Sequence, residues 1–175
     1  MYKCFLRFGL LWLSILPVGV ALSSELLPFA GLTAGSAVSS SDDPFDATDS
    51  AYLFIGIQTE YYVTYELGAT RIDTNKPKPI VNQRRTLSML GVSALGHLPI
   101  GDSSLFVRLG VSGYQYFDPQ DVLQDVFVPT YGAGLDLGII PRLTLRLEWQ
   151  RYVDMELNHV KFDIEAIRIG LFYYF

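Results

Sequence analysis

The sequence is almost free of cysteine, and its single cysteine, Cys4, lies at the very start of the chain. That start has the pattern of a secretory signal peptide, so we expect the mature chain to contain no thiol. Disulfide bridges, thiolate metal sites and cysteine nucleophiles are then excluded, and the fold must hold without covalent cross-links.

The sequence also lacks long apolar runs beyond its first residues. The run from Phe8 to Leu22 follows Lys3 and Arg7 and covers about 15 residues, short of the roughly 20 that a retained membrane anchor would need. With small residues for cleavage before Ser24, it predicts a signal peptide at 1–23 and one domain at 24–175. Because no later stretch reaches about 18 apolar residues, the domain can cross a membrane only with strands.

Positive charge is scarce as well. Without Lys3 and Arg7, 11 basic residues remain beside 18 acidic ones, a formal charge of −7, which argues against a nucleic-acid partner. By contrast, hydrophobic residues make up 50% of the chain and the mean hydropathy is +0.26, too apolar for a disordered protein and high for a soluble one. A surface that faces lipid is therefore a serious possibility.

Apolar residues alternate with polar or small ones in segments of about ten residues, the period of a strand with two different faces. Helical spacing is not sustained anywhere. The predicted strands are 28–38, 52–58, 62–72, 87–98, 105–116, 130–138, 143–152 and 166–175.

The predicted connections alternate between short and long. Short turns are expected at 58–61, 99–103 and 139–142, and long polar loops at 39–50, 73–86, 117–127 and 153–165. Bacterial outer-membrane barrels have short turns on the periplasmic rim and long loops outside. The pattern predicts an all-β fold, an eight-stranded antiparallel up-and-down transmembrane barrel with both termini periplasmic and the long loops extracellular.

The two faces of each strand differ sharply. In 143–152, one face carries leucine and tryptophan, and the other carries Thr144, Arg146, Glu148 and Gln150. A soluble barrel would show the same alternation with its apolar face buried. Glycines are concentrated on the polar face, where they suit a crowded interior better than a solvated surface, so we favour lipid on the apolar side.

With that orientation, three acidic and three basic side chains point into the barrel: Glu66, Arg108, Asp136, Arg146, Glu148 and Arg168. Charges inside a barrel are tolerated when they are paired and hydrogen-bonded. An eight-stranded barrel is only wide enough for its own side chains, so we expect this charge network to plug the interior. The alternative is that the network gates a narrow ion path.

Several of these segments resemble the OmpA-like transmembrane domain family across nearly the whole mature chain, from about Pro28 to Phe175. The segments that carry the resemblance are PFAGLTAG (28–35), DDPFDATDS (42–50), YELG (65–68), RLG (108–110), YGAGLD (131–136), LRLEWQ (145–150) and IGLFYYF (169–175).

The resemblance implies that Glu66, Asp136 and Arg146 belong to the interior salt-bridge cluster of the family. It also implies that the closing strand, with Tyr173 and Phe175, is the signal read by the outer-membrane barrel assembly machinery. One departure is the fourth strand, where Gly91, Ser93 and Leu95 replace an inward basic residue, so that Arg108 or Arg168 must supply that charge. The family's periplasmic peptidoglycan-binding domain is not expected.

We weighed three functions. The leading hypothesis is a non-enzymatic outer-membrane barrel that supports envelope integrity, with surface loops available for adhesion; the second is a narrow pore. The third, a lipid A-modifying enzyme, would need a Ser, a His and a carboxylate together at the outer rim. His97 lies beside a short turn at the opposite end, and His159 lies in a long loop but has no serine after it at strand spacing.

We expect no cofactor and no metal. Asp42, Asp43, Asp46 and Asp49 resemble a calcium site only loosely and are interpreted as a solvated acidic loop. The expected partners are outer-membrane lipid, lipopolysaccharide, the assembly machinery and an unidentified surface ligand. The basic residues Lys76, Lys78, Arg84 and Arg85 of the second long loop could contact lipopolysaccharide phosphates, or they could equally form a solvated face.

Overall fold

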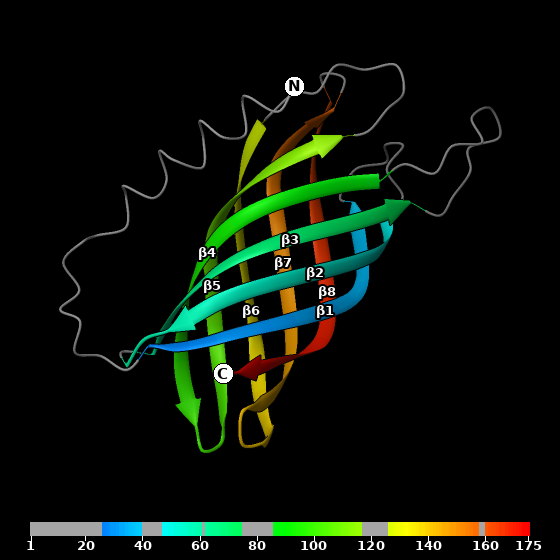
Figure 1. Cartoon of the computed structure of the whole chain (residues 1–175). Coiled ribbons are helices and arrows are strands. Elements are labelled where there is room, and N and C mark those ends of the chain that lie inside the picture. The colour runs from blue at the N-terminus through cyan, green and yellow to red at the C-terminus, as the bar shows by residue number, and fades with distance from the viewer. Residues whose placement is uncertain (1–25, 40–46, 61, 75–85, 117–125, 158–159) are drawn as a thin grey trace, which may run out of the picture.

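The computed structural model describes residues 26–39, 47–60, 62–74, 86–116, 126–157 and 160–175, and the predicted signal peptide lies outside them. These residues form eight antiparallel strands that close into one barrel, as predicted (Figure 1). The strands are β1 Leu27–Ser39, β2 Ala47–Gln58, β3 Val63–Thr74, β4 Thr86–Ile100, β5 Ser103–Tyr116, β6 Val126–Ile140, β7 Leu143–Leu157 and β8 Val160–Tyr174. In this part of the chain, no helix is long and apolar enough to cross a membrane.

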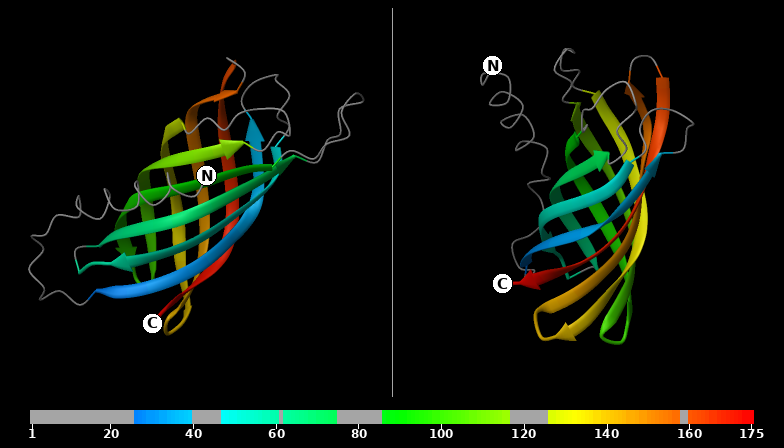
Figure 2. Two further views of the ribbon diagram at one scale, coloured as in Figure 1. Left: turned by 45° about the horizontal axis from the view of Figure 1, so that its top comes forward. Right: turned by 90° about the vertical axis from the view of Figure 1, so that its right-hand side faces the viewer.

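The strands are staggered and strongly tilted around the barrel axis (Figure 2). A path across the paired residues starts at Phe29 on β1 and returns to β1 at Ser39, ten residues further along the strand. The path runs through Gly56, Glu66, Ser93, Gly110, Thr130, Tyr152 and Ile164. Strand number, tilt and stagger together fix a narrow barrel whose interior holds side chains.

The wall has an apolar outside and a charged inside. Outward residues such as Leu109 and Ile167 are 69% and 66% exposed, whereas Arg108, Arg146 and Arg168 are each 1% exposed. A soluble barrel would show the reverse. The lipid-facing orientation inferred from the alternating faces therefore matches the structure.

The short turns lie together at one end of the barrel. They join β2 to β3, β4 to β5 and β6 to β7, and the C-terminal end of β8 lies at the same end (Figure 1). In the β4–β5 turn, Gly101 has φ 61, a left-handed conformation that glycine adopts without strain. The three short turns predicted from the sequence are thus found where they were expected.

The prediction of a long loop at 153–165 is wrong, because β7 and β8 continue as a paired hairpin through most of these residues. Two β7 residues, Val153 and Asp154, lie opposite the single β8 residue Asp163, and Asp154 has φ 55. This bulge changes the register between Tyr152 and Met155, so the simple alternation breaks. The charged residues that suggested a loop instead pair on the outer wall, where Arg151 Nη2 lies 2.6 Å from Asp163 Oδ2.

Candidate functional site

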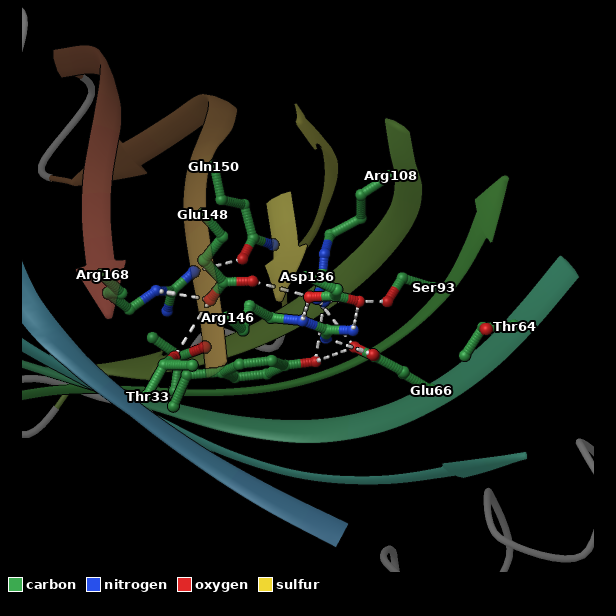
Figure 3. Close-up of polar contacts among 12 residues, drawn as sticks. Thr33, Thr64, Glu66, Ser93, Arg108, Asp136, Arg146, Glu148, Gln150 and Arg168 are labelled. Carbon is green, nitrogen blue, oxygen red and sulfur yellow. Dashed lines mark hydrogen bonds and ion pairs between the residues drawn. The ribbon is translucent and has the colours of Figure 1, made fainter. Parts of the chain in front are cut away.

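The middle of the barrel contains the six charged residues selected from the sequence. They come from β3, β5, β6, β7 and β8, and their side chains point from the wall toward one another (Figure 3). All six are buried: Glu66, Arg108, Asp136, Arg146, Glu148 and Arg168. Because neighbouring strands are staggered, residues far apart in sequence reach the same depth.

Arg146 of β7 is at the centre of the lower half of this network, the half nearer the short turns. Its Nε and Nη2 donate to the two oxygens of Asp136 at 2.8 and 2.9 Å, and its Nη1 donates to Glu66 Oε1 at 2.5 Å. Asp136 is the direct cross-strand partner of Arg146 on β6, whereas Glu66 projects from β3 on the far wall. Arg146 therefore braces the barrel across its width with charge-assisted hydrogen bonds.

Three aromatic rings surround the same guanidinium. Its Cζ lies 4.9 Å from the ring centre of Phe54 and 4.7 Å from those of Phe106 and Phe172. Cation–π contacts of this kind gain strength when water is excluded, so they stabilise Arg146 in addition to its two carboxylates.

In the upper half of the network, the half farther from the short turns, Arg108 and Arg168 both pair with Glu148. Arg108 Nη2 lies 2.7 Å from Glu66 Oε2 and 3.1 Å from Glu148 Oε2, and Arg168 Nε lies 3.0 Å from Glu148 Oε1. Arg108 thus joins the two halves through Glu66. Its Nη1 also donates to Ser93 Oγ on β4 at 3.1 Å. Arg108 thus supplies a positive charge beside the fourth strand, which has no inward basic residue of its own.

Several uncharged side chains also contact the network. Tyr52 OH accepts from Arg108 Nη1 at 2.8 Å and donates to Glu66 Oε2 at 3.3 Å, and Thr33 Oγ1 donates to Glu148 Oε1 at 3.0 Å. Gln150 Oε1 accepts from Arg168 Nη2. All three lie at inward positions of their strands, so the alternation already placed them inside; only their contacts needed the structure.

The interior glycines make room for these large side chains. A Cβ on Gly68 would collide with the ring of Tyr52, and one on Gly134 with Phe106 and the backbone at Leu147. The crowded interior inferred from the glycines of the polar face is found at these positions.

Apolar layers lie on both sides of the charged layer. Toward the short turns, Phe29, Tyr52, Phe54 and Phe172 pack together, with Tyr174 against them. Toward the opposite end lies a larger buried cluster that we call the upper apolar layer: Ala37, Ile72, Leu87, Met89, Tyr114, Val128, Tyr152, Met155, Phe162, Ile164 and Ala166.

The upper apolar layer also closes a gap in the wall. Pairing between β6 and β7 ends at Thr130 and Tyr152, although both strands continue. Tyr114 of β5 reaches across to β7, where its hydroxyl donates to the carbonyl of Glu156 at 2.7 Å and accepts from its N–H at 3.0 Å. One side chain thus replaces a missing strand contact.

The two histidines considered as catalytic residues have different outcomes. His97 lies inside the barrel near the short turns, with Nε2 3.0 Å from Thr64 Oγ1 and Nδ1 3.2 Å from Ser104 Oγ. His159 lies outside the described residues, as do the acidic residues 42, 43 and 46 and the basic residues 76, 78, 84 and 85. Among the described residues, no three His, Cys, Asp or Glu side chains gather as metal ligands.

The two residues of the expected assembly signal lie on the outer wall. Tyr173 and Phe175 are exposed, and their ring centres are 5.7 Å apart. The N–H of Phe175 donates to the carbonyl of Pro28 at 3.0 Å, which fastens the last residue to β1 at the seam of the barrel.

An apolar outer wall, a closed ring of eight strands and an ionic interior define a small transmembrane β-barrel. The sequence matches the outer membrane protein beta-barrel domain over residues 8–175, and the chain belongs to that family. It is an integral protein of the outer membrane.

Solved structures with the same fold come from several bacteria. Neisserial surface protein A is 17% identical with a TM-score of 0.66, and the match covers 86% of this chain and 97% of that one. Ail of Yersinia pestis, solved with the heparin analogue sucrose octasulfate, is 13% identical with a TM-score of 0.55, covering 87% and 99%. The N-terminal barrel of Pseudomonas aeruginosa OprF is 13% identical with a TM-score of 0.53, covering 84% and 97%. A search of curated proteins finds no match.

Proposed function

We propose that the protein is a non-enzymatic, non-conducting barrel that supports the integrity of the outer membrane and presents its loops at the cell surface. The single observation that carries this proposal is the filling of the interior by two successive layers. A braced ionic layer occupies the middle, and the upper apolar layer occupies the end away from the short turns.

Each layer opposes the passage of ions for a different reason. In the middle, an ion would have to separate Arg146 from Asp136 or Glu66, and breaking such a buried pair costs about 3–5 kcal/mol. In the upper apolar layer, an ion would lose its hydration and meet mostly apolar side chains, since the hydroxyl groups of Tyr114 and Tyr152 already bind Glu156 and Thr70. The narrow-pore alternative requires both layers to open together.

The orientation is part of the proposal. In outer-membrane barrels the short turns face the periplasm. We therefore assign the short-turn end, with the C-terminal end of β8, to the periplasm and the predicted long loops to the outer surface. Tyr173 and Phe175 would then be presented to the assembly machinery from the periplasmic side.

Surface contact is the second part of the proposal. Ail, a barrel of the same fold, has been solved with a heparin analogue and is described as an attachment invasion locus protein. In this chain Lys76, Lys78, Arg84 and Arg85 fall within the predicted second long loop. We propose that this basic segment contacts the phosphates of lipopolysaccharide, whose anions it complements in charge.

Recordings from purified protein in planar lipid bilayers test the closed interior. We expect no reproducible current steps from the wild-type protein. Steps should appear only when both layers are disrupted, as in Arg146→Ala combined with Met155→Ala. Reproducible wild-type steps that Arg146→Ala alters would favour the pore instead.

The cellular role has its own test. Cells without the protein should become more sensitive to detergent, and wild-type protein should restore their resistance. Unchanged detergent sensitivity together with unchanged surface binding would contradict the proposal. A change in lipid A mass on expression, lost with His159→Ala, would point to the enzyme.

A further inference from the structure

The ring of His97 is held at the short-turn end of the interior by two hydroxyl groups from different strands. Thr64 of β3 lies at its Nε2 and Ser104 of β5 at its Nδ1, at 3.0 and 3.2 Å. The Phe106 ring lies 5.7 Å away, and the backbone N–H of His97 donates to the carbonyl of Tyr62 at 2.8 Å. The side chain is only 5% exposed, so its position is fixed by the wall.

Both hydroxyl partners suit either charge state of the ring. A hydroxyl group can donate one hydrogen bond and accept others, so Thr64 and Ser104 can accept from a protonated ring as well as donate to a neutral one. His97 can therefore take up a proton by rotation of a hydroxyl group, without movement of β3, β4 or β5.

The charges that face this ring belong to the ionic network. His97 Nδ1 lies 3.9 Å from Asp136 Oδ2 of β6, the oxygen that also accepts from Arg146 Nη2 of β7 at 2.9 Å. Glu66 of β3 and Arg108 of β5 lie next in the network. At the same end, Tyr174 of β8 donates to Gln58 Oε1 at 2.5 Å.

We propose that His97 is a proton-binding site that controls how firmly Asp136 holds Arg146. With a neutral ring, the three carboxylates and three guanidinium groups of the interior balance. One proton on His97 adds a positive charge that competes with Arg146 for Asp136. Arg146 then shifts toward Glu66, and the brace between β6 and β7 loosens as the pH falls.

Nuclear magnetic resonance of the full chain in detergent micelles, with ¹⁵N-labelled arginine and histidine, tests this coupling. Arg146 Nε donates directly to Asp136 and is the reporter. Arg151 Nε, which donates to Asp163 Oδ2 at 3.2 Å on the outer wall, is the internal control. The titration runs from about pH 8 to about pH 5, where histidine ordinarily changes its charge.

We expect the Arg146 Nε signal to move with the same midpoint as the His97 ring, while the Arg151 signal stays in place. The movement should vanish in His97→Asn, or in His97→Gln if the first variant does not fold, and should persist in His159→Asn. The inference is overturned if His97 does not titrate in this range, if Arg146 ignores its titration, or if the response survives in the His97 variants. These outcomes do not depend on whether the barrel conducts ions.

Discussion

Removal of Arg146 should unbalance the interior more than any other single change to the network. In Arg146→Met, Asp136 loses both of its donors, and the basic side chain that remains beside it in the described interior is His97 at 3.9 Å. Glu66, by contrast, keeps Arg108 at 2.7 Å. An isolated buried carboxylate makes such a change cost about 3–5 kcal/mol of unfolding free energy.

The reciprocal change should cost less. In Asp136→Asn, Arg146 still donates to Glu66 and keeps its three aromatic rings, so we expect a loss of about 1.5–3 kcal/mol. The double variant leaves two acids and two arginines in balance. It should be no less stable than Arg146→Met alone, with a coupling of about 0.5–3 kcal/mol between the two positions.

Urea unfolding of protein refolded into lipid vesicles measures these free energies, and heat-dependent gel mobility reports the folded fraction. Arg151→Met is the matched control, because Arg151 pairs with Asp163 on the outer wall, where an exposed ion pair contributes little to stability. If Arg146→Met cost as little as this control, or if the two interior substitutions were additive, the bracing role of Arg146 would be refuted.

Three further predictions concern the wall. Leu109→Arg places a charge on a lipid-facing position and should cost about 2–4 kcal/mol in vesicles near the bilayer midplane; a smaller loss than at an outer-rim position would count against that placement. Gly170→Ala should prevent folding, because its Cβ would overlap the backbone at Leu32. Gly96→Ala should fold, because its Cβ would meet only the Val107 side chain at an ordinary 3.8 Å, and equal yields of heat-modifiable protein from the two variants would contradict this. Tyr114→Phe removes the hydroxyl that bridges to β7, so amide exchange there should speed up by an amount equivalent to about 1–3 kcal/mol, and unchanged exchange would mean that the bridge is dispensable.

The alternation of faces predicted most of this fold because each outward position sees lipid and each inward position sees protein. Glu66, Arg108 and Arg168 were placed inside from this period alone, and the short turns follow from the lengths between strands. The prediction was weakest where the period broke, at the bulge of Val153 and Asp154 on β7. It also assigned 47–50 to a loop, whereas β2 already begins at Ala47.

Contacts within the interior could not be read from the sequence. Whether Arg108 or Arg168 compensates for the fourth strand depends on the stagger between strands, which alternation does not fix. The same stagger brings Tyr52 to Glu66 and His97 to Asp136. The alternation of apolar and polar residues predicts which face of a strand a residue lies on. It does not predict which side chains of other strands that residue contacts.

The fluorescence of Trp149 shows whether the outer wall of the barrel faces lipid, because Trp12 lies in the predicted signal peptide and Trp149 is then the single tryptophan of the mature chain. Trp149 lies on the outward face of β7, with its ring 5.7 Å from that of Tyr131. In refolded vesicles, lipids brominated on their acyl chains should quench its emission strongly and aqueous acrylamide only weakly. Strong acrylamide quenching without any effect of the brominated lipids would show that this wall does not face the bilayer.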